Sequence, residues 1–188
     1  NTTFFVKSTN KSVYQKEKAN NLFSFIWSQS KAVITHEYLT TKGINANGAK
    51  VSNQGDLVLS IRDIDNNLKG LQFIKPDGAK KICPHSMLKG NFGLIIGAVN
   101  DKLLICEGFS TACSIFEATK QTVIYSFSAN NLLNVAKNIR HKSTKTLVIC
   151  GDNDKAGIDA ANSCTKTITD CVSVFPLQNN DFNDEYLF

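Results

Sequence analysis

The sequence predicts an α/β fold, a mostly parallel sheet flanked by helices, preceded by a small basic α+β subdomain. From residue 101 onward, short apolar strand patterns alternate with helical patterns, which is typical of a parallel sheet covered on both faces. Before that point, strand patterns follow one another across turn signals, as in antiparallel hairpins. The charge changes at the same place: residues 1–100 hold 13 Lys or Arg against 6 Asp or Glu, and residues 101–188 hold 8 against 10.

Three parts of the chain follow from these changes. Residues 1–20 are polar and weakly periodic, and we expect them to form a flexible arm. Residues 21–100 should form the basic N-terminal α+β subdomain, and residues 101–188 the α/β domain. No apolar run reaches the roughly 18 residues that cross a bilayer, and no signal peptide opens the chain. We therefore expect a soluble protein that has no membrane partner.

A helical region and a small β-meander are expected in the first 100 residues. Apolar residues recur at helical spacing from Asn21 to Thr41, which predicts one helix, or two with a break near Ser28 to Ser30. Alternating apolar residues over 57–61 and 68–74 predict the two strands of a β-hairpin. A third short strand is predicted over Lys80 to Cys83, after a Pro-Asp-Gly turn.

The predicted meander carries a group of basic residues. Lysines along a sheet can follow a nucleic-acid backbone or bind nucleotide phosphates. A solvated sheet edge that is protected against aggregation would carry lysines as well, so both interpretations stay open at this point. The residues are Arg62, Lys69, Lys75, Lys80, Lys81 and Lys89.

Strands and helices alternate in the second half. Strands are predicted over Leu103–Cys106, Thr122–Phe127, Leu147–Cys150 and Cys171–Phe175, and helices over Ser110–Thr119, Asn130–Arg140 and Lys155–Thr169. In sheets of this kind, ligands bind at the carboxyl ends of the strands. The residues that follow each strand are therefore the first candidates for a functional site.

Carboxylates follow two of these strands. Glu107 comes directly after the strand ending at residue 106, and Asp152 and Asp154 come after the one ending at residue 150, where they can point to the same side. If the two strands are parallel neighbours, the three acids meet at one rim and repel one another unless a divalent cation such as Mg²⁺ lies between them. Alternatively, Asp154 only caps the helix that begins near Lys155. Gly108 would let the backbone turn sharply after the glutamate.

Several motifs resemble a known family. The sequences ICEG at 105–108 and GDNDKAG at 151–157, and the acidic tail at 181–184, are similar to the Toprim domain shared by bacterial-type primases, topoisomerases and some nucleases. The resemblance covers about the last 90 residues and is strongest to DnaG-like primases of phages and plasmids. The segment from His36 to Ile44 resembles the one that precedes such catalytic cores.

The resemblance implies a DNA primase core that makes short RNA primers on single-stranded DNA, for replication of a phage or mobile element. Glu107, Asp152 and Asp154 would be catalytic and would bind Mg²⁺, or Mn²⁺, with Asp181 and Asp184 as further metal ligands. The expected nucleotide- or DNA-binding residues are Arg62, Lys69, Lys75, Lys80, Lys81, Lys89, Gly108 and Lys155.

Partners and alternatives follow from the same resemblance. The expected partners are the single-stranded template, NTPs and a replicative helicase in the same chain or a separate one, in the cytoplasm of a bacterial host. A Toprim nuclease or topoisomerase would use the same acids to cleave strands. A non-catalytic module that binds DNA within a replication complex is the third interpretation.

Overall fold

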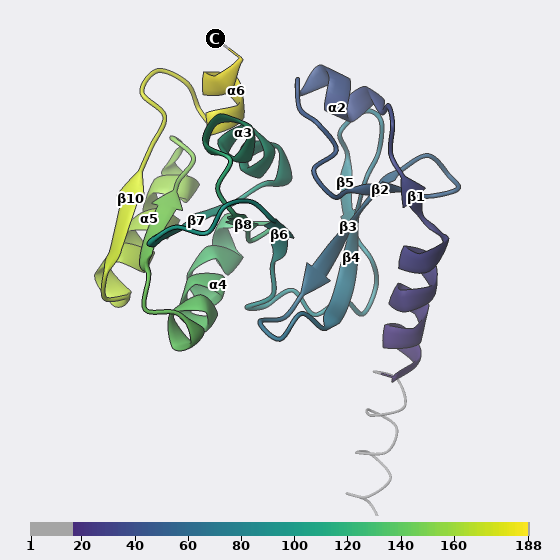
Figure 1. The fold of residues 1–188 in the computed structure, drawn as a ribbon, viewed down its shortest axis with the longest axis horizontal. Coiled ribbons are helices and arrows are strands. Elements are labelled where there is room, and N and C mark those ends of the chain that lie inside the picture. Colours follow the sequence, from purple (N-terminus) through teal and green to yellow (C-terminus); the bar gives the residue numbers. More distant parts are fainter. Residues whose placement is uncertain (1–16, 188) are drawn as a thin grey trace, which may run out of the picture.

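The computed structural model describes residues 17–187, which form two sheets packed side by side (Figure 1). The arm expected over residues 1–20 lies outside the described residues, except for residues 17–20, which are helical. None of the helices within residues 17–187 is long and apolar enough to cross a membrane.

The first half of the described chain forms an antiparallel sheet. A helix covers residues 17–29, followed by β1 (Lys31–Ala32), α2 (Glu37–Thr41), β2 (Lys50–Val51), β3 (Leu57–Arg62), β4 (Leu68–Ile74) and β5 (Lys80–Ile82). The predicted hairpin is confirmed as β3 and β4, and the predicted third strand as β5. The helical pattern gives two helices, and the break between them is wider than predicted because it contains β1.

The first sheet is covered on both faces. Successive residues of a strand point to opposite sides, so β3 contributes to two cores. Leu57, Leu59 and Ile74 pack in the same core as side chains of the second half. Val58 faces the other way and packs with Phe23 of the helix over residues 17–29. One face of this sheet is therefore turned toward the second half of the molecule.

The second half alternates strands and helices as predicted. Its elements are β6 (Gly93–Ile95), β7 (Lys102–Cys106), α3 (Phe109–Thr119), β8 (Val123–Tyr125), α4 (Ala129–Lys142), β9 (Thr146–Cys150), α5 (Lys155–Thr167), β10 (Cys171–Val174) and α6 (Phe182–Tyr186). The strand order is β10-β9-β7-β8-β6. All neighbouring strands are parallel except β6, which is antiparallel to β8. The mostly parallel sheet is therefore confirmed.

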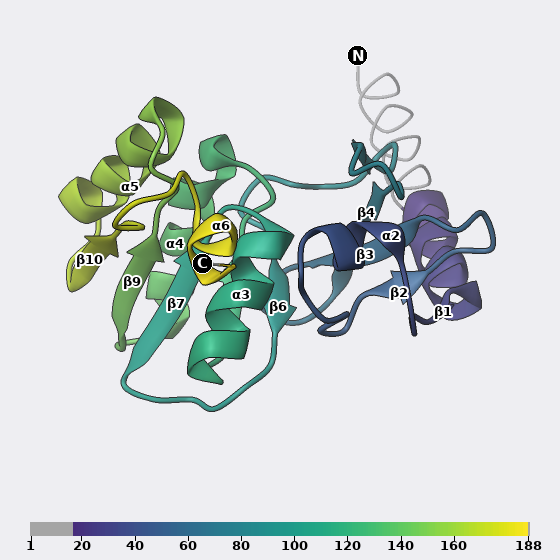
Figure 2. The same ribbon diagram turned by 90° about the horizontal axis from the view of Figure 1, so that it is seen from above.

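Helices lie on both faces of the second sheet. Helices α4 and α5 cover one face, over the fully buried side chains of Ile105, Leu147 and Ile149. Helices α3 and α6 lie together on the other face (Figure 2). That face also turns toward the first sheet, because Cys106 and Val148 share a core with residues of β3 and β4.

Strand β6 connects the two sheets. Just before it, Phe92 pairs with Arg62 at the end of β3, and their two backbone N···O distances are 2.8 and 2.9 Å. β6 then pairs with β8 of the second sheet. This strand was not predicted, since an apolar segment of only three strand residues shows no readable alternation.

Gly93→Ala is expected to destabilise the protein by about 1–3 kcal/mol, as overpacking does. A methyl group at Gly93 would overlap the ring of Tyr125, its direct partner on β8, and that ring is buried. Urea unfolding should show a lower midpoint with an unchanged slope. The same substitution should cost less in a Tyr125→Leu background, and an equal cost in both backgrounds would contradict the overlap as its cause.

Candidate active site

Two parallel strands bring the predicted acids to one end of the second sheet. β7 and β9 are direct neighbours, and Cys106 lies opposite Cys150 in their register. Glu107 follows the first strand directly, and Asp152 follows the second after a single glycine. The strand arrangement that the sequence argument required is therefore confirmed, and both acids lie at the carboxyl ends of adjacent strands.

The carboxylates of Glu107, Asp152, Asp154 and Asp181 share one electrostatic environment. Burial raises the pKa of Asp152 to about 7, and the other three carboxylates add to the increase. Burial also raises the pKa of Glu107, partly offset by a hydrogen bond from the backbone N–H of Ala129, and Asp154 raises it further. A group of carboxylates with this much mutual repulsion favours a bound cation.

One oxygen of this group lacks a partner. Asp152 Oδ1 is buried and has no hydrogen-bond partner. An oxygen in this state, among other carboxylates, fits a hard divalent cation. Within residues 17–187, no three His, Cys, Asp or Glu side chains lie close enough together to enclose a metal ion by themselves. This is compatible with Mg²⁺, which usually takes one or two carboxylates and completes its coordination with water and substrate phosphates.

Asp154 caps α5, as the alternative interpretation proposed. Its Oδ1 accepts a hydrogen bond from the backbone N–H of Gly157 at 2.8 Å. The side chain is exposed and still adds negative charge at Asp152. Lys155 begins the helix and forms an exposed ion pair with Asp159, at 2.8 Å between Nζ and Oδ2. Capping and metal binding are therefore compatible roles for Asp154, because its second oxygen remains available.

The late acids have different surroundings. Asp181 caps α6, where its Oδ1 accepts the backbone N–H groups of Asn183 and Asp184, both at 2.8 Å. It also contributes to the raised pKa of Asp152, after burial and Glu107. Asp184 instead faces Lys42 at the end of α2, at 3.9 Å. The structure thus brings Asp181 toward the acid group and pairs Asp184 with the first half of the chain.

The two neighbouring lysines of β5 lie on opposite faces of the first sheet. Lys80 pairs with Ile74, whose side chain faces the second half, and Lys81 pairs with Phe73 on the other face. Burial and the neighbouring acids raise the pKa of Glu107 and of Asp152, and the positive charge of Lys80 partly offsets this by lowering both values. Among the predicted basic residues of the first half, Lys80 is therefore the one whose charge acts on Glu107 and Asp152.

The other predicted basic residues are distributed over the first half. Arg62 donates hydrogen bonds to neighbours within its own hairpin. Lys69 forms an ion pair with Asp63 at 3.0 Å. Lys75 and Lys89 are exposed. The roles of these four residues in binding nucleotides or DNA stay predictions.

Gly108 has a smaller structural role than expected. It precedes α3 with a φ of −107° and a ψ of 160°, an extended conformation that any residue adopts. A Cβ at this position would meet only Thr111 Oγ1, at 3.8 Å. The backbone bends at Glu107, as expected, but the bend does not require glycine at position 108, because the backbone there has neither a positive φ nor a close approach. A role of Gly108 in binding nucleotides or DNA stays a prediction.

Two groups at the start of α4 belong to the site but were not predicted. The backbone N–H of Ala129 bonds to Glu107. Asn131 is buried and shares the inner face of α4 with Val135 and Ile139, at a spacing of four residues. A polar residue at a core position of a helix needs hydrogen-bond partners, so this spacing was a signal that could have drawn attention to Asn131.

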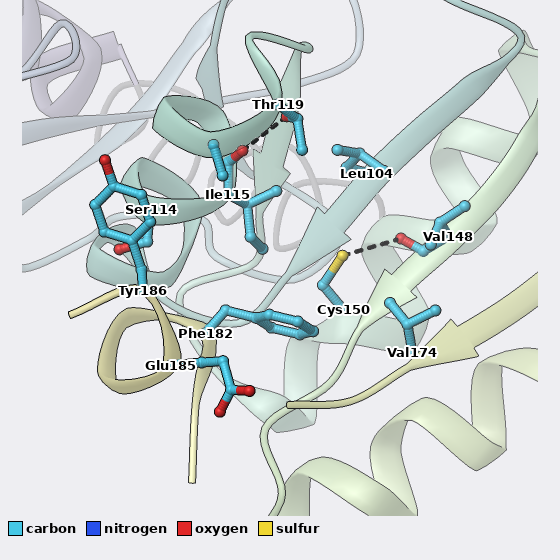
Figure 3. A pocket seen from close by; sticks show the side chains of 11 residues that line it. Leu104, Ser114, Ile115, Thr119, Val148, Cys150, Val174, Phe182, Glu185 and Tyr186 are labelled. Atoms are coloured by element: carbon cyan, nitrogen blue, oxygen red, sulfur yellow. Dashed lines mark hydrogen bonds between the residues drawn. The ribbon is translucent and has the colours of Figure 1, made fainter. Parts of the chain in front are cut away.

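An apolar cavity of about 320 Å³ has none of the predicted acids among its lining residues (Figure 3). It is enclosed by α3, the second sheet and α6, with Leu104, Val148 and Phe182 among its walls. Glu185 contributes a carboxylate to the wall of the cavity, and this carboxylate accepts hydrogen bonds from the backbone N–H groups of residues 177–179. The predicted acids do not line this cavity, so the candidate active site is the acidic rim formed after β7 and β9.

Two sequence comparisons identify relatives of the chain. The model of the Toprim domain family matches residues 102–187. DNA primase TraC of Escherichia coli is 30% identical over 137 residues, which cover 68% of this chain and 13% of that protein. The chain thus spans a small part of the length of this relative.

Solved structures share the fold. The DnaG primase catalytic domain bound to single-stranded DNA matches with a TM-score of 0.64 and 13% identity, over 92% of this chain and 75% of that one. The primase fragment of the bacteriophage T7 primase-helicase protein matches with a TM-score of 0.61 and 16% identity, over 84% of this chain and 75% of that one. The fold predicted from the sequence is therefore confirmed over both halves.

Proposed function

We propose that the chain is the catalytic core of a DNA primase, which makes short RNA primers on single-stranded DNA for a plasmid or phage. The match of residues 102–187 to the model of the Toprim domain family supports this proposal. The similarity to TraC supports this choice within the family. The observation that carries the proposal is the acidic rim, where Lys80 of the first half lies near Glu107 and Asp152 of the second.

The acids fit Mg²⁺, or Mn²⁺, held by Asp152 with Glu107 and Asp154 close by. Such an ion would stabilise negative charge on the phosphates of an incoming NTP. Asp181 would support the site by its charge, and direct ligation by Asp181 or Asp184 remains a proposal. Water and phosphate oxygens would complete the coordination, since the protein supplies fewer than three enclosing ligands within the described residues.

Two residues have proposed roles beyond holding the ion. Glu107 has a raised pKa through burial, which suits a carboxylate that accepts a proton from an attacking primer hydroxyl near neutral pH. Lys80 carries a positive charge to the same rim and would bind the triphosphate. Together they would orient the reacting groups in a site that is partly closed to water.

The proposed partners are a single-stranded DNA template, NTPs and a replicative helicase. The T7 relative is part of a primase-helicase protein, and the DnaG domain was solved with single-stranded DNA, which supports the template and helicase. The helicase would belong to the same chain or to a separate protein. Action in the cytoplasm of a bacterial host stays a prediction.

Primer synthesis tests the proposed function directly. The protein should be incubated with single-stranded template, labelled NTPs and Mg²⁺ or Mn²⁺, and the reaction analysed for short products and for template cleavage. Short RNA products that depend on template and metal support the proposal. Cleavage without synthesis would favour the nuclease alternative, and salt-sensitive DNA binding with neither reaction would favour the binding module.

Lys80→Gln should lower kcat/KM for NTP about 10- to 100-fold, because the proposed hydrogen bond from a charged donor to phosphate is lost. Lys81→Gln is the matched control, since it removes the same charge one residue away on the opposite face of β5. Its kcat/KM for NTP should stay within about twofold of the wild type, because Lys81 lies on the face turned away from the second half. A role of Lys81 in binding DNA stays a prediction. Equal losses of kcat/KM in both variants would contradict the proposal that Lys80 binds the nucleotide because it lies on the face of β5 turned toward the second half.

A further inference from the structure

The turn from Leu88 to Asn91 depends on the second half for its hydrogen bonds. It carries the exposed Lys89 and the buried Gly90, whose φ of +74° is a conformation that favours glycine. Within the turn, Asn91 N–H donates to Leu88 O at 2.9 Å. Side chains of α4 bond to further backbone groups of the turn, at Leu88, Gly90 and Asn91.

Asn131 supplies most of these bonds. Its Oδ1 accepts the N–H of Gly90 at 2.8 Å, and its Nδ2 lies 2.9 Å from both Leu88 O and Asn91 O. The side chain is buried, with 4% exposure, so its bonds to Gly90 N–H and Asn91 O are protected from water. A second side chain of α4, Asn138, donates from Nδ2 to Gly90 O at 2.9 Å.

The same asparagine is connected to the acidic rim. Its Nδ2 also lies 2.9 Å from Ser126 O, and Ser126 N–H donates to Cys106 O at 3.0 Å, directly before Glu107 in the chain. Glu107 itself accepts a hydrogen bond from the backbone N–H of Ala129, two residues before Asn131. The first turn of α4 therefore holds both the Leu88–Asn91 turn and Glu107.

We propose that Asn131 is a positioning residue: it fixes the Leu88–Asn91 turn so that Lys89 binds a phosphate of the nucleic acid that reaches Glu107. This inference rests on the proposed function of the rim. Asn131 acts through the turn and contacts neither metal nor substrate. A short residue with both a donor and an acceptor is required, because Asn131 bonds to a backbone N–H and to carbonyl oxygens at once.

A double-mutant cycle between Asn131→Ala and Lys89→Gln tests this inference. Asn131→Ala should lower kcat/KM for primer synthesis about 10- to 100-fold, as the misplacement of a binding group does. In the Lys89→Gln background the same substitution should cost less than about threefold, because the residue it positions is already absent. The full cost in both backgrounds would overturn the inference and leave Asn131 with a structural role only.

Salt dependence gives a readout that is independent of primer synthesis. The slope of log K against log salt for binding a single-stranded oligonucleotide should fall by about one in Asn131→Ala and in Lys89→Gln alike, as the loss of one phosphate contact predicts. An unchanged slope in Asn131→Ala, with a reduced slope in Lys89→Gln, would overturn the positioning role. If the wild type makes no primers, the proposed function fails, while the slopes still decide the role of Asn131.

Two further variants guard against misfolding. Asn131→Asp keeps the shape of the side chain and removes its donors, and Asn138→Ala removes one bond to the same Gly90 from a less buried site. Both should reduce the salt slope in the same direction as Asn131→Ala. Folded variants with unchanged slopes would overturn the inference even if Asn131→Ala does not fold.

Discussion

Asp152→Asn is expected to lower primer synthesis at least about 10³-fold, the scale of losing a preorganised charge at a reacting centre. The amide keeps the shape of the carboxylate and removes its charge, so a divalent cation loses the ligand whose Oδ1 has no other partner. Rates should be measured with template and NTPs at several Mg²⁺ concentrations. Activity that returns to the wild-type level at high Mg²⁺ would contradict an essential role for this ligand.

The same substitution should stabilise the metal-free protein. Burial and neighbouring carboxylates raise the pKa of Asp152 from 3.8 to about 7, so the folded state binds its proton more tightly than the unfolded state does. The stability of the wild type should therefore fall as the pH rises from about 4 to about 7. Asp152→Asn should flatten this part of the profile, with a melting temperature near pH 8 at least about 2 °C above that of the wild type.

Melting profiles in a chelator, from pH 4.5 to pH 8, check this expectation. Asp159→Asn is a matched control, because Asp159 is an exposed acid of α5 paired with Lys155 rather than with other acids. It should leave the shape of the profile unchanged. Addition of Mg²⁺ should raise the melting temperature of the wild type and of the control, but not of Asp152→Asn. Parallel profiles for all three proteins would contradict the charge repulsion.

Glu107→Gln should abolish primer synthesis to a similar extent, about 10³-fold, while single-stranded DNA is still bound. The raised pKa of Glu107, caused by burial, implies that the wild-type rate rises with pH as the carboxylate loses its proton. This limb of the pH–rate profile should disappear in the variant. Synthesis and binding should be measured on the same preparations, so that a folding defect is recognised as a joint loss of both.

Glu117→Gln is the control for the loss of a glutamate from the same region of the chain. Glu117 lies on α3 and accepts hydrogen bonds from Asn45 N–H and Asn47 Nδ2, each at 2.8 Å, so its role joins the two halves of the chain. It should lower stability moderately and leave kcat nearly unchanged. If Glu117→Gln and Glu107→Gln reduce kcat equally, the position of Glu107 at the rim is not what decides activity.

The sequence predicted which acids follow strands, but their proximity depends on sheet order. The local sequence shows one apolar run followed by Glu107 and another that ends just before Asp152, and each run predicts the end of a strand. β7 and β9 are neighbours only because β8, which lies between them in the chain, is placed on the other side of β7. The position of β8 in the sheet is determined by long-range packing. The sequence therefore predicted that the acids meet only if the two strands that precede them are neighbours.

Other features of the site could not be predicted from the sequence, because they also depend on tertiary packing. Alternation along β5 puts Lys80 and Lys81 on opposite faces, but which face meets the acids depends on how the two sheets pack. The capping of α6 by Asp181 and the pairing of Asp184 with Lys42 likewise depend on tertiary contacts. Local signals were sufficient for the hairpin of β3 and β4, whose strands and turn lie within a single short segment.

Strand β6 implies that the family match and the physical folding unit have different borders. The match begins at residue 102, whereas the sheet it belongs to takes β6 from residues 93–95. A polypeptide cut at residue 102 would expose the backbone edge of β8, which is a template for intermolecular strand pairing. We expect that excised piece to aggregate. A fusion of this domain to another protein should fold only if it also includes the segment that precedes β7.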